Sequence, residues 1–117
     1  MLSLSASTRI YIALGATDMR KGFDGLCGLV IEQLKQDPLC GALYLFINKR
    51  RDRMKVLYWD GDGLAIWYRR LEQGTFRLPN VNPETSCIEI RSDEFTMLLR
   101  GIDLTSVKRH KRFSLAS

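Results

Sequence analysis

Residues 43–62, LYLFINKRRDRMKVLYWDGD, predict a β-hairpin around which the rest of the chain is arranged. Aliphatic and aromatic residues alternate with a period of two on both sides of a short polar break, which is the pattern of two paired strands. We expect the hairpin to lie at the centre of a sheet and its tip to project into solvent. One face of the two strands carries Leu43, Leu45 and Ile47 before the break and Met54, Val56 and Tyr58 after it.

Positive charge gathers in two short segments, the hairpin tip and a second basic run, KRHKR, at residues 108–112. They hold nine of the 18 Lys and Arg residues but one of the 13 Asp and Glu residues, so the rest of the chain has a net charge of −3 within a total of +5. A patch of this kind is expected where a protein meets a polyanion or an acidic partner. The cations of the hairpin are Lys49, Arg50, Arg51, Arg53 and Lys55.

Further strands and helices are expected on either side of the hairpin. Residues 9–14 and 86–90 have the character of strands, while apolar spacings of three and four predict helices over residues 19–34 and 92–102. Residues 64–71 also show helical spacing, but the alternation of Leu64, Ile66 and Tyr68 leaves a strand as the alternative. We therefore predict an α+β fold with a small antiparallel sheet, a central β-hairpin and about three helices packed mainly on one face.

Local signals set the expected ends of these helices. Thr17 or Asp18 is the expected N-cap of the first helix, and Ser92 is the expected N-cap of the last. Three glycines spaced three apart inside the first helix each cost up to about 1 kcal/mol relative to alanine, so we expect them to permit a close approach of the sheet. These glycines are Gly22, Gly25 and Gly28.

The length of 117 residues suits a single domain, which we place at residues 1–104, followed by a basic, mobile tail at residues 105–117. No apolar run reaches the roughly 20 residues that a membrane helix needs, and the N-terminus lacks the pattern of a signal peptide. Three cysteines without CxxC spacing are expected as free, mostly buried thiols. These features predict a cytoplasmic protein that does not contact a membrane.

Four segments, TDMRKGFDGL (17–26), NKRRDRMKVLYWDGDGL (48–64), YRRLEQGTFRLP (68–79) and LLRGID (98–103), carry a family resemblance in matching order. They resemble the accessory protein of the insertion-sequence-66 family, the TnpB-type transposition protein from the second open reading frame of the element. The resemblance implies an accessory role beside a DDE-type transposase, without implying a chemical activity. Two features depart from the family pattern: Leu78 replaces an aromatic residue, and the sequence diverges after Asp103.

Contact with DNA during transposition is the first hypothesis for function. Lys and Arg on the hairpin can neutralise phosphates, and Arg can also bind a guanine edge with two hydrogen bonds. If the alternation continues into the turn, Arg51, Arg53 and Lys55 are neighbours on one strand face. The residues predicted to bind nucleic acid are Lys49, Arg50, Arg51, Arg53 and Lys55, then Arg69 and Arg70 on the exposed side of the helix expected at 64–71, and Lys108, Arg109, Lys111 and Arg112 in the tail.

A protein-interaction subunit is the second hypothesis, in which the same basic tip binds the transposase of the element and does not contact DNA. Unpaired edges of a small sheet can also support a homo-oligomer. The sequence leaves DNA and transposase open as partners, and solvated surface charge without a partner is the plain alternative to both.

Catalysis is not expected, and neither a cofactor nor a metal is predicted. Asp18, Asp24, Asp60 and Asp62 could supply carboxylates to a two-metal phosphodiesterase, but each suits a helix cap, a polar helix face or a turn. The one histidine, His110, lies in the basic tail, which disfavours a metal site or a nucleophile–histidine pair. The aromatic residues weighed as a base-stacking platform, and assigned instead to the core, are Phe46, Tyr58, Trp59 and Trp67.

Overall fold

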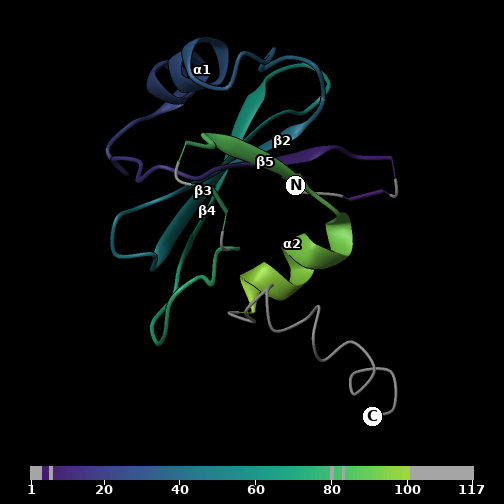
Figure 1. Ribbon diagram of the computed structural model, residues 1–117. Helices are drawn as coiled ribbons and strands as arrows, with labels where there is room; N and C mark the ends of the chain where they lie inside the picture. Colours follow the sequence, from purple (N-terminus) through teal and green to yellow (C-terminus); the bar gives the residue numbers. More distant parts are fainter. Residues whose placement is uncertain (1–3, 6, 80, 83, 101–117) are drawn as a thin grey trace.

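A five-stranded mixed sheet lies between two helices (Figure 1) in the computed structural model, which describes residues 4–5, 7–79, 81–82 and 84–100. The strand order is β4-β3-β2-β1-β5. β1 and β2 are parallel because α1 connects them, and the other neighbouring strands are antiparallel. The elements are β1 (Ile10–Ala13), α1 (Phe23–Glu32), β2 (Leu43–Ile47), β3 (Arg53–Trp59), β4 (Leu64–Arg70), β5 (Cys87–Ile90) and α2 (Ser92–Leu99).

The predicted hairpin is confirmed as β2 and β3. Phe46 pairs with Lys55, and Ile47 pairs with Met54 at the end that faces the basic turn. β2 is the central strand, as expected, but it pairs in parallel with β1 on its other side, so the sheet is mixed rather than purely antiparallel.

Residues 64–70 form a strand, so the helix predicted there is wrong and the alternative is correct. The register runs from Trp59 paired with Leu64 to Arg53 paired with Arg70, which gives every residue of β4 a partner in β3. The tight turn at residues 60–63 joins the two strands, and Asp60 donates its backbone N–H to Gly63. Pairing with a neighbouring strand outweighed the helical spacing, and two helices remain among the described residues.

The helices cover opposite faces of the sheet, which corrects the prediction that they pack mainly on one face. Ile10 and Ile12 of β1 pack in a cluster with Phe95 of α2, whereas Tyr11 and Ala13 pack in a second cluster with α1. Figure 1 shows α1 and α2 on opposite sides of the strands. All residues of β1 and β2 are buried, and strands that are apolar on both faces require a layer on each side.

The helix ends differ from those predicted. Gly22 is the N-cap of α1 and makes no side-chain capping bond, so neither Thr17 nor Asp18 caps the helix. Arg91 is the N-cap of α2, where its backbone N–H donates to Glu94, and Ser92 is the first helical residue. The N-cap of α2 lies one residue before its predicted position, and the N-cap of α1 lies about four residues after its predicted position. The difference at α1 arises because the chain after β1 first forms a loop against the hairpin turn.

The helical glycines do not serve close packing as predicted. A Cβ built on Gly28 meets nothing within 4 Å, and one built on Gly25 meets only the Lys21 side chain, at 3.1 Å. Neither glycine is therefore required by contact between α1 and the sheet.

Phe76 is a core residue that the sequence pattern did not predict. Phe76 lies in the segment after β4, is fully buried and packs with the cluster on the α2 face. All three cysteines are free thiols, although Cys40 is exposed. No helix in the described part of the chain has the length and apolar character to cross a membrane. The whole predicted tail at residues 105–117, including KRHKR at 108–112, lies outside the described residues.

Candidate nucleic-acid interface

The basic turn between β2 and β3 is built around Asn48. The Asn48 Oδ1 accepts hydrogen bonds from the backbone N–H groups of Asp52 and Arg53, both at 3.0 Å. The Asn48 Nδ2 donates to the Asp52 carboxylate at 2.8 Å. Arg51 takes a left-handed backbone conformation with φ 61°, which is unfavourable for a residue other than glycine. The three bonds of Asn48 fix the turn despite this cost.

Two other segments brace the turn from either side. The backbone N–H groups of Leu71 and Phe76 donate to the carbonyl oxygens of Asp52 and Arg51, each at 2.7 Å. On the other side, the Thr17 N–H donates to the Ile47 carbonyl at 2.9 Å. The tip therefore projects its cationic side chains, but its backbone is fixed by the loop after β1 and the segment after β4.

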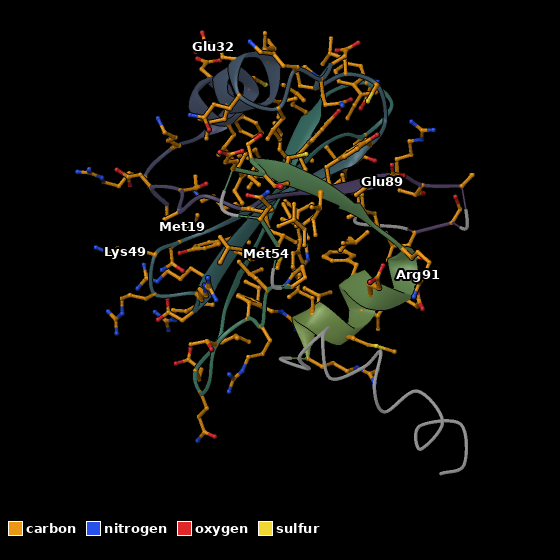
Figure 2. The ribbon with its side chains drawn as sticks, in the orientation of Figure 1. Met19, Glu32, Lys49, Met54, Glu89 and Arg91 are labelled. Carbon is orange, nitrogen blue, oxygen red and sulfur yellow. The ribbon has the colours of Figure 1, made fainter. Side chains whose placement is uncertain are left out.

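A groove of about 620 Å³ runs between this turn and the loop that precedes α1. Four cations line it, three from the hairpin and one from the loop: Lys49, Arg50, Arg53 and Arg20. Figure 2 shows Lys49 and Met19, which also lines the groove, on the same side of the molecule and away from Arg91, the N-cap of α2. Two segments separated by about 30 residues of sequence thus contribute charge to one surface, which we call the basic groove.

Arg70 adds charge beside the basic groove. It lies directly opposite Arg53 in the β3–β4 pair, and the two side chains share the α1 face of the sheet. Like charges at such a pair destabilise a sheet. Glu72 partly neutralises Arg70, with hydrogen bonds of 2.9 and 3.1 Å between guanidinium and carboxylate. The pair concentrates positive potential at a cost in stability.

Lys55 lies on the same face but is engaged within the protein. Its Nζ donates to the Lys21 carbonyl at 2.9 Å and lies 5.4 Å from the ring centroid of Tyr68. The Lys21 carbonyl comes just before the N-cap of α1, so Lys55 ties the loop before the helix to the sheet.

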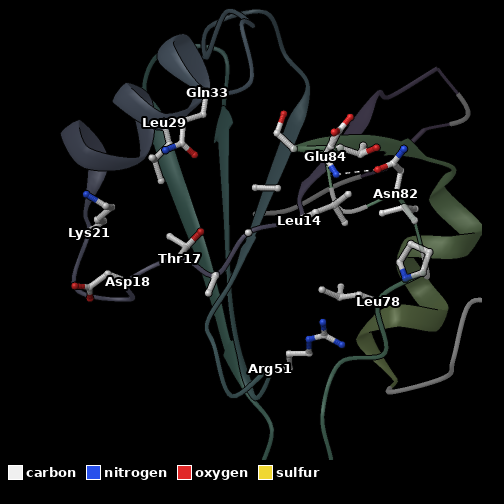
Figure 3. A pocket seen from close by; sticks show the side chains of 17 residues that line it. Leu14, Thr17, Asp18, Lys21, Leu29, Gln33, Arg51, Leu78, Asn82 and Glu84 are labelled. Carbon is white, nitrogen blue, oxygen red and sulfur yellow. Dashed lines mark hydrogen bonds between the residues drawn. The ribbon is translucent and has the colours of Figure 1, made fainter.

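Two of the cations predicted for the site lie elsewhere. Arg51 lines a neighbouring pocket of about 650 Å³, where Figure 3 shows it on the side of Leu78. Arg69 lies on the α2 face, where its guanidinium is 5.1 Å from the Trp67 ring centroid and donates to the Leu99 carbonyl at 3.4 Å. Arg51 leaves the expected strand face because of its left-handed turn conformation. Arg69 and Arg70 diverge because consecutive strand residues point to opposite faces.

Two carboxylates moderate the charge of the basic groove. Hydrogen bonds from Arg20 lower the pKa of Asp18 to about 2, and the guanidinium–carboxylate distance is 2.7 Å. Hydrogen bonding by Asn48 lowers the pKa of Asp52, helped by Arg50, whose guanidinium is 4.0 Å away. Both carboxylates are therefore ionised at neutral pH. The Arg50 side chain is nevertheless 84% exposed, and Lys49 and Arg53 form no ion pair with any described residue.

The aspartates weighed for metal chemistry are not brought together. Asp18 lies at the end of the sheet that carries the basic turn, whereas Asp60 and Asp62 lie in the turn at the other end of β3. Asp24 is exposed in the first turn of α1. Within the described ranges, no group of three or more His, Cys, Asp or Glu residues has the arrangement of a metal site.

The aromatic residues divide between the core and the surface. Phe46 and Tyr58 are buried, and Trp67 packs partly buried against the cluster under α2. Tyr68, which the sequence did not indicate as a stacking residue, lines the basic groove and is 48% exposed. Arg20 was also missed, although MRK in the first family segment carries a second local cluster of cations.

Cations from separate segments converge on one groove of a small α+β protein, an arrangement typical of a binding protein for an anionic partner. Residues 8–109 match the family described as IS66 Orf2 like protein, and the chain belongs to this family. The match extends past Asp103, where the sequence was expected to diverge. Membership indicates a transposition-related accessory role, and the family is not a known catalytic one.

Two relatives from Sinorhizobium fredii are similar to nearly the whole chain. A protein named "Uncharacterized protein y4jC" is 38% identical over 109 residues, which cover 93% of this chain and 92% of the relative. A protein named "Uncharacterized protein y4hO" is 39% identical over 103 residues, which cover 88% of each. No solved structure matches the chain.

Proposed function

We propose that this protein is a non-enzymatic accessory factor of transposition that contacts DNA through the basic groove. The observation that carries the proposal is the convergence of Lys49, Arg50 and Arg53 with Arg20 on one groove. Their ammonium and guanidinium groups can neutralise phosphates, and Arg70 extends the charge along β4. Arg51 and Arg69, which point elsewhere, are not part of this proposed contact. The tail cations at 108–112 remain candidates by charge alone.

The proposal predicts how the affinity for DNA depends on salt concentration. Each phosphate neutralised by a cation contributes about −0.9 to the slope of log affinity against log salt concentration for duplex DNA. Contact by the four cations of the groove and Arg70 therefore predicts a slope of about −3 to −5. Removing one such contact reduces the slope by about 1.

Arg69 and Arg70 offer a matched pair of variants for the test. They are adjacent in β4 and lose the same charge on substitution, but only Arg70 lies on the face of the groove. We expect Arg70→Gln to weaken DNA binding and reduce the salt slope, Arg50→Gln with Arg53→Gln to weaken it further, and Arg69→Gln to leave both quantities nearly unchanged. Fluorescence anisotropy at several salt concentrations measures affinity and slope. Equal effects of Arg69→Gln and Arg70→Gln would exclude the groove as the contact.

A protein partner is the second candidate, and the outer surface of α1 favours it. Phe23 is 48% exposed and Ile31 is 54% exposed, and both lie on one side of the helix, eight residues apart. A contiguous exposed apolar patch of sufficient size is typical of a protein contact. Under this alternative, the transposase of the same element binds this protein directly, and the basic groove contacts an acidic surface of the transposase.

A pull-down with the transposase distinguishes the two candidates. Association that survives nuclease treatment and is reduced by Ile31→Glu supports the protein contact. Association that is lost on nuclease treatment and on Arg50→Gln with Arg53→Gln supports the DNA contact, because the proteins are then joined through DNA.

A further inference from the structure

We infer that the basic groove takes single-stranded rather than duplex DNA, with one unpaired base stacked on Tyr68; the inference rests on the proposed DNA contact. Tyr68 combines three properties that a stacking residue needs. It lines the groove together with Arg53, Lys49 and Arg20, and it is 48% exposed. It also lies on β4, the edge strand of the sheet, so no further strand covers its outer side.

The Tyr68 ring is supported from within the protein. Tyr68 and Lys55 are directly paired across β4 and β3, and the Lys55 Nζ lies 5.4 Å from the ring centroid. Lys55 is itself fixed by its hydrogen bond to the Lys21 carbonyl. A cation of this kind is attracted by the electrons of an aromatic ring. The ring is thus oriented before a ligand arrives, and less conformational entropy is lost on binding.

Three other aromatic residues on this face have a structural role. Tyr11 and Tyr44 stack on each other with their centroids 5.6 Å apart, and both are buried under α1 with Phe46. Core packing accounts for these three rings, whereas it does not account for the exposed surface of Tyr68. Complete burial of an aromatic side chain of this size would stabilise the fold by about 1.5–3 kcal/mol.

The combination of a ring and flanking cations selects the class of ligand. In a duplex, each base is stacked between its neighbours, so its flat face is not available to a protein side chain. Unpaired bases expose their faces, and proteins that bind single strands combine a cationic groove with aromatic side chains on which bases stack. Arg53 and Arg70, opposite each other near Tyr68, are placed to neutralise the phosphates beside the stacked base.

Binding of a labelled 12-nucleotide oligo-dT and of a duplex of the same length tests the inference by fluorescence anisotropy. We expect the parent protein to prefer the single strand, and Tyr68→Ala to weaken single-strand binding by about 5- to 150-fold. The salt slope should remain unchanged, since stacking releases no counterions. Tyr68→Phe, which keeps the ring, should bind within about twofold of the parent, whereas Tyr68→Leu should resemble Tyr68→Ala.

A spectroscopic probe separates stacking from an indirect structural effect. An oligonucleotide with one 2-aminopurine loses fluorescence when this base stacks, so we expect quenching by the parent and by Tyr68→Phe but not by Tyr68→Leu. The inference is overturned if duplex DNA binds as tightly as the single strand, if Tyr68→Leu quenches like the parent, or if Tyr68→Ala lowers the salt slope. If the parent protein binds neither the single strand nor the duplex in a salt-dependent way, the proposed function itself fails.

Discussion

Substitution of Asn48 by alanine tests whether one side chain fixes the basic turn. Asn48→Ala removes two bonds to backbone N–H groups at 3.0 Å and one to the Asp52 carboxylate at 2.8 Å. A net hydrogen bond contributes about 0.5–1.5 kcal/mol to stability. Because the turn is partly exposed, water replaces some of these bonds, and we expect a loss of about 1–3 kcal/mol in the free energy of unfolding.

Urea denaturation measures this loss. With a slope of about 2 kcal/mol per molar urea, a loss of 2 kcal/mol lowers the unfolding midpoint by about 1 M. Asn82→Ala is the matched control, because the Asn82 Oδ1 accepts one hydrogen bond from the exposed Glu84 N–H, at 3.0 Å. This local bond should contribute less than about 0.5 kcal/mol.

Hydrogen exchange gives a local measure of the same effect. The N–H groups of Asp52 and Arg53 lose their acceptor in Asn48→Ala, so their exchange should accelerate more than that of Leu45 in the neighbouring strand. DNA affinity should fall as well, because Arg50 and Arg53 are no longer held beside Lys49. A stability change below about 0.5 kcal/mol, with unaltered exchange at Asp52 and Arg53, would refute the role assigned to Asn48.

The remaining predictions concern stability, charge and DNA binding. Gly28→Ala should stabilise the protein by about 0.5–1 kcal/mol in urea denaturation, because the added Cβ meets open space. The added Cβ of Gly25→Ala would lie 3.1 Å from the Lys21 side chain, so a similar gain for this variant would contradict the explanation. Phe76→Ala should destabilise by about 3–5 kcal/mol, and a loss under 1 kcal/mol would mean that this ring is not in the core. The Asp18 carboxylate stabilises the fold above its unfolded pKa, and this contribution is lost as the pH falls from about 4 to about 2. Arg20→Gln should raise the Asp18 pKa toward its usual value in a carboxyl NMR titration, and an unmoved pKa would remove the ion pair as its cause. Asp18→Asn should strengthen DNA binding, because it releases Arg20 from its ion pair. Complete loss of transposition activity in Asp18→Asn would instead favour a catalytic carboxylate.

The sequence by itself determined the hairpin, the α+β class and the family, because these depend on short-range patterns. Alternation on both sides of a polar break is sufficient for β2 and β3, since the period of side chains along a strand is two. Residues 64–70 fit both periods, and pairing with β3 decided between them. Such a decision depends on a partner strand, which local spacing does not contain.

Only the tertiary structure decided which cations share a surface. Arg20 and Lys49 line the same groove, although about 30 residues separate them in the chain, because the loop after β1 contacts the hairpin turn. Arg51 points away from this groove because its backbone has a positive φ angle. Arg69 and Arg70 separate because a strand places adjacent residues on opposite faces, and the expected helix would have kept both on one side. Charge content is therefore a property of the sequence, but the direction of each charge follows from backbone conformation and strand pairing.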